Sequence, residues 1–411
     1  MSFDAPMILG DLSPAALRAS GSMKWTMYPE QINGHKTIPC FVAEMDFAPA
    51  ANIRKALKHW AEHAPLGYRP PALVESFQHV IAEHYRNLGL VVGPEAIRPI
   101  SDVMTAYDAV ARIFTDPGTP ITLMTPAYMN FVGHIFGDQR PVRNVAMLPP
   151  DALHQQWRID WDGLEKALAD GGLLVLVNPH NPIGKVYNQT ELEHIAELAQ
   201  QYGVRVFVDE IHEPLVFNGH HHIPFASLNA AAAECAITAW SCTKAFSIPG
   251  TKAASLIFTR EDDLRRWDQF GQHFEMGTAS SGYVATISAL EEGAEWFRAA
   301  LSQLEKNRER LTQLIAAHLP GATYTPPEAT YLAWIDLRGT DNYEAVAAKV
   351  TETFSFADAT ARRCGVIATD GAATGADGEG HLRVNFATGP EVLDDIAARL
   401  GSVFTNKGAD Y

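Results

Sequence analysis

The feature that most constrains the fold is an alternation of short apolar runs and amphipathic helical segments through the middle of the chain. The runs are rich in β-forming residues and almost wholly apolar, which is typical of strands buried on both faces of a sheet. Between two of them, residues 190–203 predict a helix, with Thr190 and Glu193 as a capping box and Gly203 at its end. Such strand–helix–strand units predict an α/β domain with a mainly parallel, mixed sheet, in which ligands bind beyond the carboxyl ends of the strands. The predicted strands are residues 121–124, 173–177, 204–209, 236–240 and 254–258.

The pattern changes after about Ser288, where a second, smaller α+β domain is expected. Residues 291–319 predict one long amphipathic helix, and residues 342–354 predict another helical segment. Strand-like runs occur at 330–337 and 381–387, and a glycine-rich segment at 371–380 reads as a surface loop. We therefore expect three parts: residues 1–50 packing with the small domain, a large domain over 51–288, and the small domain over 289–411.

The composition argues against several classes of function. The chain of 411 residues carries 48 acidic and 32 basic residues, a net charge of −16, which provides no electrostatic footprint for nucleic acid or anionic lipid. No apolar run approaches the roughly 18 residues of a membrane span, and the N-terminus lacks a signal-peptide pattern. The four cysteines have no metal-ligand spacing, so we expect a reduced, cytoplasmic protein. The adjacent histidines at 220–222 should diverge in a loop, and we expect no metal site there.

A lysine lies between two of the predicted buried strands. In the segment SCTKAF, Lys244 follows the strand at 236–240 within a stretch of small and polar residues. Burial disfavours the charged ammonium group and lowers the pKa of a lysine. An amine that is neutral near pH 7 is a nucleophile that can form a Schiff base with an aldehyde. Lys244 is therefore the first candidate for a reactive residue.

Other polar residues also follow predicted strands and should lie at the same edge of the sheet. Asp209 ends the strand at 204–209 and His212 lies three residues further on, although a capping aspartate and a surface histidine are the plainer interpretation of such a pair. Ser241 precedes Lys244 by three residues and Lys252 follows it by eight, so a hydroxyl group and a cation could hold a phosphate near the amine. The spacing S-x-x-K also marks penicillin-recognising serine enzymes, but the S-D-N and K-T-G strings that those enzymes need do not occur in this sequence.

The motif NPHNPIG, residues 178–184, places two Asn-Pro pairs and a glycine directly after a predicted strand, which indicates a rigid turn. Together with VDEIHEP at 208–214 and SCTKAF at 241–246, in this order, it resembles the fold-type-I pyridoxal phosphate enzymes of the aspartate aminotransferase superfamily. The three segments in combination are far more specific than any one of them. The resemblance implies pyridoxal 5′-phosphate (PLP) as the cofactor, held by a large α/β domain with a smaller α+β domain beside it.

The resemblance also assigns roles to individual residues. Lys244 forms the Schiff base with PLP and acts as the general base, and Asp209 pairs with the pyridinium nitrogen. Arg383 binds the substrate carboxylate, and Tyr68 acts at the cofactor phosphate of the neighbouring subunit, which implies a homodimer with shared active sites. The other implied cofactor contacts are Asn181 at the phenolic oxygen, Tyr128 stacked on the ring, His212 where most aminotransferases have a tyrosine, and Ser241, Lys252 and the backbone amides of Met104, Thr105 and Ala106 at the phosphate.

Further motifs resemble the cystathionine β-lyase and cysteine-S-conjugate lyase branch, the MalY/PatB type, across essentially the whole chain. They are KWTMYPE at 24–30, FVAEMDFAPA at 41–50, GYRPP at 67–71 and TYLAWIDL at 330–337, together with His212. The implied reaction is β-elimination from a cysteine thioether such as cystathionine, which gives a thiol, pyruvate and ammonia. Transamination of a small amino acid uses the same residues and is the alternative. A PLP-binding sensor without turnover is disfavoured, because the sequence contains no basic helix-turn-helix pattern.

Overall fold

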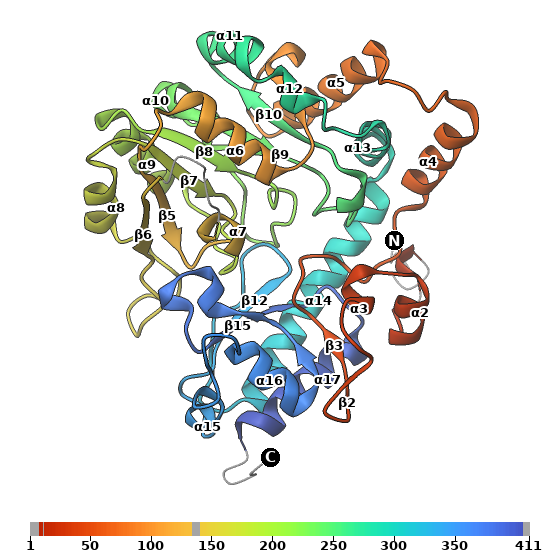
Figure 1. Cartoon of the computed structure of the whole chain (residues 1–411), viewed down its shortest axis with the longest axis vertical. Helices are drawn as coiled ribbons and strands as arrows, with labels where there is room; N and C mark the ends of the chain where they lie inside the picture. Colours follow the sequence, from red (N-terminus) through yellow and green to blue (C-terminus); the bar gives the residue numbers. More distant parts are fainter. Residues whose placement is uncertain (1–7, 11, 134–139, 406–411) are drawn as a thin grey trace.

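The computed structural model describes residues 8–10, 12–133 and 140–405. Within these residues a seven-stranded sheet has the order β4-β10-β9-β8-β7-β5-β6 and forms the core of the upper half of the molecule in Figure 1. The strands from β9 to β6 run parallel, whereas β10 is antiparallel to both of its neighbours. This mixed, mainly parallel sheet confirms the predicted fold class. The strands are β4 (Ile97–Ile100), β5 (Ile121–Thr125), β6 (Val142–Ala146), β7 (Leu173–Val177), β8 (Arg205–Asp209), β9 (Ala236–Trp240) and β10 (Ala254–Phe258).

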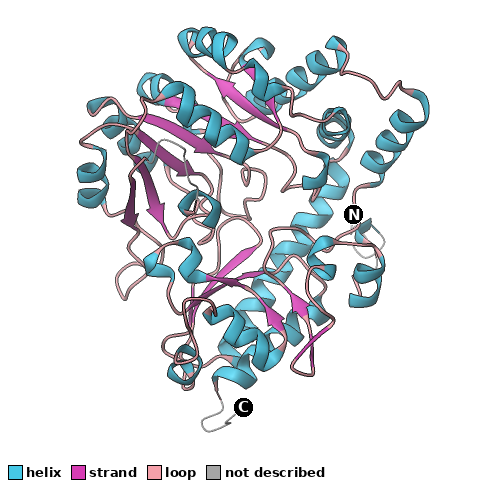
Figure 2. Ribbon diagram, in the orientation of Figure 1, coloured by secondary structure: helices cyan, strands magenta, loops and turns pink. Residues whose placement is uncertain are grey.

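Both faces of this sheet are buried, as the apolar runs predict. Along β7, Leu173 and Val175 join one core cluster, and Leu174 and Leu176 join the other, because successive side chains of a strand point to opposite faces. Figure 2 shows helices on both sides of the strands. One cluster includes residues of α6 (Val103–Phe114), α7 (Met129–Val132), α11 (Glu261–Phe270) and α12 (Gln272–Glu275); the other includes residues of α4 (Ala51–His63), α5 (Pro71–Asn87), α8 (Trp161–Leu168), α9 (Gln189–Gln201), α10 (Ala230–Cys235) and α13 (Ser280–Glu292).

A smaller antiparallel sheet lies below the large one in Figure 1, with the order β11-β12-β15-β14 among the described residues. Helix α14 (Ala294–His318) runs from the large sheet to this one, and it is separated from α13 by Gly293. The buried amide of Asn307 on α14 donates hydrogen bonds to the backbone oxygens of Phe386 and Thr388, both at 2.8 Å, and so fixes the helix to the end of β15. The other elements here are β11 (Thr323–Tyr324), β12 (Leu332–Asp336), β14 (Thr369–Asp370), β15 (His381–Asn385), α15 (Tyr343–Ala347), α16 (Phe356–Cys364) and α17 (Pro390–Phe404).

The N-terminal segment is anchored to the same half of the molecule. Strand β3 (Ile38–Pro39) pairs in parallel with β13 (Val366–Ile367). A fully buried ion pair joins Lys24 Nζ to Asp46 Oδ2 at 3.0 Å, and Trp25 Nε1 donates to the other carboxylate oxygen at 2.7 Å. The motifs KWTMYPE and FVAEMDFAPA therefore meet in space, where each buried charge has its partner. The remaining elements of the segment are α2 (Pro14–Ala19), α3 (Met23–Thr26), β1 (Gln31–Ile32) and β2 (His35–Lys36).

Two local predictions about helix ends are wrong. The capping box of α9 is formed by Asn188 and Glu191, two residues before the predicted pair, since Asn188 Oδ1 accepts from the Glu191 amide at 3.0 Å. The helix predicted over 342–354 ends at Ala347, and the chain then turns, with a bridge between Thr351 and Phe354. In α9 the side-chain cap lies before the residues that the pattern indicates, whereas after Ala347 the pattern continues past the point where a turn ends the helix.

The glycine-rich segment at 371–380 is also more structured than a surface loop. It folds into two short 3₁₀ turns, η4 (Gly371–Thr374) and η5 (Ala376–Gly378), and packs beyond β5, where the Ala127 amide donates to Thr374 O at 2.8 Å. At Gly371 an added Cβ would lie 2.1 Å from Gly378 O, so the turn has no room for a side chain. The glycines here serve close backbone packing.

Among the described helices, none is long and apolar enough to cross a membrane. The cysteines at 40, 235, 242 and 364 are free and buried. Burial raises the pKa of the Cys40 thiol to about 12, so this group stays protonated near neutral pH. We therefore regard Cys40 as a packing residue.

Candidate active site

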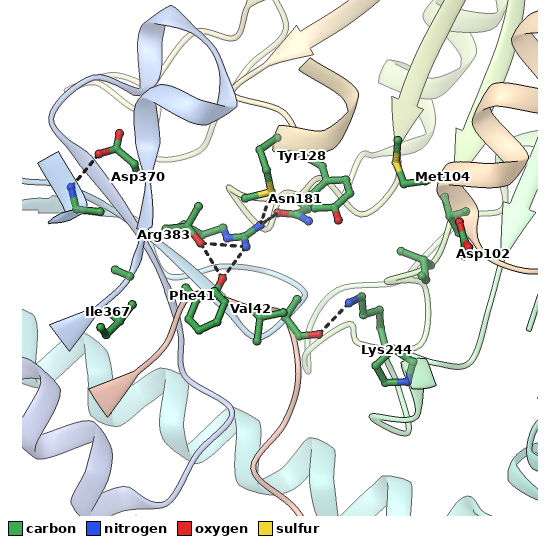
Figure 3. Close-up of a pocket in the computed structure, with 18 of the residues that line it drawn as sticks. Phe41, Val42, Asp102, Met104, Tyr128, Asn181, Lys244, Ile367, Asp370 and Arg383 are labelled. Carbon is green, nitrogen blue, oxygen red and sulfur yellow. Dashed lines mark hydrogen bonds between the residues drawn. The ribbon is translucent and has the colours of Figure 1, made fainter. Parts of the chain in front are cut away.

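A cavity of about 1020 Å³ opens beyond the carboxyl ends of the parallel strands, between the two sheets (Figure 3). Side chains from both halves of the molecule and from the N-terminal segment line it. Tyr68, Thr105 and Ala106 are not among the lining residues. The sequence-predicted residues that the cavity does bring together are Met104, Tyr128, Asn181, Asp209, His212, Ser241, Lys244, Lys252 and Arg383.

Lys244 lies in the turn after β9, and its side chain extends toward the N-terminal segment. Its Nζ donates a hydrogen bond to Ala43 O at 2.8 Å (Figure 3). Burial lowers the pKa of this amine to about 8, and the positive charge of Arg383 lowers it further in the same direction. At pH 7 the neutral amine is then about a tenth of the population, against fewer than about one in a thousand for an ordinary lysine. Lys244 is therefore a nucleophile near neutral pH.

Asp209 is the last residue of β8, and it is buried at the bottom of the cavity. The Ile211 amide donates to Asp209 Oδ1 at 3.0 Å. Burial raises the pKa of this carboxyl group to about 7, against the opposing effects of that hydrogen bond and of Lys244. His212, one turn further on, is buried too, and burial together with the nearby Lys244 and Arg383 lowers its pKa to about 3. The imidazole is therefore neutral, and the carboxyl group is poised to pair with a cation.

Arg383 and Asn181 form the opposite wall of the cavity. Arg383 on β15 donates from Nη1 to Asn181 Oδ1 at 3.3 Å, and from Nη2 to Phe41 O at 2.8 Å. Burial lowers the pKa of this guanidinium to about 10, so it remains charged at neutral pH. The turn that carries Asn181 depends on Gly184, which has φ +68° and where an added Cβ would lie 2.2 Å from Pro327 Cβ. The NPHNPIG motif thus brings an amide side chain to the arginine through a turn that has no space for a larger residue.

The N-terminus of α6 differs in detail from the prediction. Asp102 is the N-cap, and its Oδ1 accepts from the Thr105 amide at 2.8 Å, while the Ala106 amide donates to Asp102 O at 3.0 Å. Two of the three predicted phosphate-binding amides, those of Thr105 and Ala106, are thus engaged within the helix, and the cavity is lined by residues 101–104. Lys252 Nζ lies 2.5 Å from Asp102 Oδ2. Burial raises the Asp102 pKa, but the hydrogen bonds from Lys252 and Thr105 outweigh it, and the pKa is lowered overall.

Of the two tyrosines that the resemblance assigns to the cofactor, one lines the cavity and the other does not. Tyr128 is the N-cap of α7 and lines the cavity near Asn181, and its hydroxyl accepts from Asn130 Nδ2 at 2.7 Å. Tyr68 lies in the link between α4 and α5, at the outer edge of the molecule in Figure 1, and its side chain is fully exposed. Arg69, the next residue, holds this link against α13 by donating to Tyr283 Oη at 3.0 Å. Tyr68 therefore does not line the cavity.

The sequence interpretation missed several residues of the cavity. Asp102 has an N-capping pattern with Thr105, which a capping search could have found. Thr243, whose amide donates to Ser241 Oγ at 3.2 Å, lies within the quoted SCTKAF motif. The backbone oxygens of Phe41 and Ala43 carry no sequence signal, because any residue supplies the same acceptor.

The histidines at 220–222 diverge, as expected. His220 Nδ1 lies 3.7 Å from Glu328 Oε1, and His222 Nε2 lies 3.5 Å from Glu210 Oε1 in the core. In the part of the chain that the structure describes, no cluster of three or more His, Cys, Asp or Glu residues could hold a metal ion.

The cavity residues fit PLP. Ser241, Lys252 and the first turn of α6 offer hydroxyl, ammonium and backbone donors for a phosphate. Lys244 is an amine suited to an aldehyde, and Asp209 is a buried acid suited to a protonated ring nitrogen. Arg383 Nε and His212 Nδ1 are buried without a hydrogen-bond partner among the described residues, which is the state expected of groups that bind a ligand.

Comparisons with known proteins agree with this site. A family model described as aminotransferase class I and II matches residues 42–400. Cystathionine beta-lyase of Corynebacterium glutamicum is 31% identical over 391 residues, 94% of this chain and 98% of that protein. Cystathionine beta-lyase PatB of Bacillus subtilis is 29% identical over 383 residues, 92% of this chain and 95% of the relative. The PLP-bound C–S lyase of Staphylococcus hominis superimposes with a TM-score of 0.83 at 25% identity, over 98% of this chain and 99% of that one.

These matches confirm the resemblance that the motifs indicate. The relatives align along nearly their whole length, so the likeness extends beyond the residues that line the cavity. The family model matches residues 42–400, which is most of this chain. The chain therefore belongs to the aminotransferase class I and II family.

Proposed function

We propose that this protein is a PLP-dependent carbon–sulfur lyase that performs β-elimination on cysteine thioethers such as cystathionine. The reaction breaks the Cα–H and Cβ–S bonds, consumes one water, and gives a thiol, pyruvate and ammonia. The observation that carries the proposal is an amine with a lowered pKa, Lys244, in one cavity with the acid Asp209 and the cation Arg383. The full-length relatives named cystathionine beta-lyase favour elimination over other reactions of the family.

When bound, PLP supplies an aldehyde carbon for amines and a ring that withdraws electrons from the substrate Cα. Arg383 binds the α-carboxylate of the amino acid, where its unpaired Nε offers a charged donor. Lys244 Nζ removes the Cα proton, and its lowered pKa makes the neutral base available near pH 7. Asp209 would pair with the ring nitrogen of the cofactor, whose positive charge would lower the raised carboxyl pKa and keep the carboxylate ionised.

The phosphate end would be held by the first turn of α6 together with Ser241 and Lys252. Val103 and Met104 line the cavity, whereas the amides of Thr105 and Ala106 are already used by the helix. Lys252 would exchange its contact with Asp102 for the phosphate, or hold both as a bridge. His212, neutral in the cavity, adds no further cation beside Lys244 and Arg383.

The predicted homodimer is part of this proposal. Tyr68 and its neighbour Leu66 project from the α4–α5 link with exposed fractions of 101% and 72%. A second copy packed on this link would bury both side chains and bring Tyr68 to the phosphate of its partner. The firm attachment of Arg69 to Tyr283 would hold Tyr68 in position for that contact.

Mixed dimers test the shared site. A dimer of one Tyr68→Phe subunit and one Lys244→Ala subunit has one intact site if Tyr68 serves the partner, and it has none if each site is self-contained. We expect the tagged and purified mixed dimers to show about half of the wild-type activity, well above that of either parent variant. Activity no higher than half that of the Tyr68→Phe parent would contradict sharing, and sedimentation would show whether the dimer forms.

The alternative is an aminotransferase, which the description of the matching family model favours. One assay separates the two: the PLP-loaded protein is incubated with L-cystathionine, with and without 2-oxoglutarate. Thiol and pyruvate released without the keto acid support the lyase. Glutamate formed only with the keto acid, and no thiol, would instead establish the aminotransferase.

A further inference from the structure

The cavity continues from Lys244 past Arg383 to helix α16. In Figure 3, Lys244 and Asp102 lie on one side of Arg383, and Ile367 and Asp370 lie on the other. Beyond Asp370 the lining continues onto Ser355, Asp358 and Arg362. A substrate whose α-carboxylate is bound at Arg383 would therefore have space for a substantial group beyond the reacting carbon.

The walls of this extension are mostly apolar. Tyr28 and Phe41 come from the N-terminal segment, where their rings meet edge to face at 5.3 Å, and Phe354 and Ile367 come from the small domain. An apolar passage of this kind suits a thioether sulfur and the methylene groups that follow it.

Two opposite charges line the far end. Asp358 and Arg362 are four residues apart on α16, so they lie on one face of the helix. At this spacing an acid and an arginine can pair, yet among the described residues neither side chain takes part in an ion pair. Asp358 instead forms the capping box of α16, where it accepts from the Ser355 hydroxyl at 2.8 Å and the Ser355 amide at 3.0 Å through one oxygen, and the Arg362 guanidinium lies over the Phe354 ring at 4.7 Å. A carboxylate and a guanidinium are thus held apart at the same end of the cavity.

Hydrogen bonds fix this end relative to Arg383. Arg383 Nη2 donates to Thr369 Oγ1 at 3.2 Å, and the next residue, Asp370, accepts from the Ala357 amide in the first turn of α16 at 2.8 Å. The helix that carries Asp358 and Arg362 is therefore tied through two residues of β14 to the arginine that binds the substrate carboxylate.

We propose that Arg362 and Asp358 bind the carboxylate and the ammonium group of a leaving thiol that is itself an amino acid. The enzyme would then select thioethers in which cysteine is joined through sulfur to a second amino-acid head, over simple S-alkyl cysteines. This inference rests on the proposed lyase function and adds the residues that choose the substrate. Arg362 and Asp358 do not take part in bond breaking; they bind the group that departs.

Three thioethers with the same three-carbon arm test the assignment. L-Cystathionine carries both charges at the end of the arm, S-(3-carboxypropyl)-L-cysteine carries only the carboxylate, and S-propyl-L-cysteine carries neither. For Arg362→Gln we expect kcat/KM to fall about tenfold, mainly through KM, for the two substrates with a carboxylate. For S-propyl-L-cysteine it should change less than about twofold. Asp358→Asn, which keeps an oxygen for the Ser355 contact, should weaken only L-cystathionine, by about fivefold.

The matched control is Arg363→Gln. Arg363 is the next residue, but its guanidinium donates to the backbone oxygens of Ala359 and Ala345, both at 3.3 Å, and it does not line the cavity. All three substrates should be turned over by this variant as by the wild type. If Arg362→Gln changes all three substrates equally, or none, the inference is wrong while the lyase function stands. If the wild type releases thiol from none of them, the proposed function fails and the inference fails with it.

Discussion

Asp209 and Glu210 are adjacent, acidic and buried, and yet their surroundings are opposite. Asp209 faces the cavity with one backbone donor, and burial raises its pKa to about 7. Glu210 faces the core, where it accepts from Tyr85 Oη and from the Phe225 amide, both at 2.9 Å, with His222 3.5 Å away. One carboxyl group is satisfied by its own chain, and the other is left for a partner that the chain does not supply.

The same contrast extends to the neighbouring residues. On the core side, Glu213 accepts from His84 at 2.8 Å and from Trp240 Nε1 at 3.1 Å. On the cavity side, Arg383 retains a buried nitrogen without a partner, and Lys244 bonds only a backbone oxygen among the described residues. The two core acids Glu210 and Glu213 thus find their partners within the chain, whereas Asp209, Lys244 and Arg383 in the cavity keep unused capacity for a ligand.

The largest expected effect is at Lys244. Lys244→Ala should reduce thiol release by about 10⁴-fold or more, because the variant loses both the nucleophile and the base. Its unfolding midpoint should not fall, since the substitution removes a poorly compensated buried charge. Pyruvate release and thermal unfolding measure the two effects. The control is Lys24→Ala, which leaves Asp46 buried and unpaired and should cost about 3–5 kcal/mol of stability. A stable, active Lys244→Ala enzyme would overturn the comparison.

The second largest effect is expected for Asp209→Asn. This variant should lose about 10³-fold in kcat, because the ring nitrogen loses its carboxylate partner. The asparagine still accepts from the Ile211 amide, so the free energy of unfolding should change by less than about 1 kcal/mol. Steady-state kinetics and urea denaturation test this pair of outcomes. A variant that unfolds easily but keeps its kcat would place Asp209 with Glu210 as a structural acid.

The pH dependence of cofactor capture should differ from that of a free lysine. In PLP-free protein the reacting species is neutral Lys244, so the rate should rise about tenfold per pH unit below pH 8 and level off above it. The pKa of Lys244 is lowered, and not raised, because burial favours the uncharged amine. Stopped-flow absorbance with added PLP measures the profile. A plateau reached only near pH 10 would show that the amine is not perturbed.

The smallest effect on activity is expected at Glu210. Glu210→Gln keeps an oxygen acceptor but loses the charge that faces His222, so the variant should be destabilised by about 2 kcal/mol. Below its unfolding midpoint the kcat should stay within about threefold of the wild type, since Glu210 does not line the cavity. A kcat loss as large as that of Asp209→Asn would remove the distinction between the two acids.

Much of the fold could be predicted from local sequence patterns. The runs at 173–177, 236–240 and 254–258 coincide with β7, β9 and β10 residue for residue, because strands buried on both faces need continuous apolar sequence. The helix predicted over 342–354 shows the limit of this reasoning. The chain leaves the helix after Ala347 for a turn, although its apolar spacing continues.

The site depends on contacts that no local pattern contains. Asn181 and Arg383 meet across 202 residues of sequence, and Lys252 meets Asp102 across 150. Strand ends indicated where Lys244 and Asp209 should lie, but only the family resemblance suggested Arg383 and Asn181. The sequence interpretation of the phosphate site did not consider Asp102, the N-cap that accepts from the amides of Thr105 and Ala106.

The segment at residues 41–44 has a consequence for how the protein is made. Its backbone oxygens accept from Arg383 and Asn385, across separations of 342 and 341 residues. On the ribosome this stretch is made well before its partners, which follow only after roughly 20 to 70 seconds of further translation. This part of the cavity wall must therefore wait, without these partners, until residues 383–385 have been made, and the enzyme gains its working centre only after that.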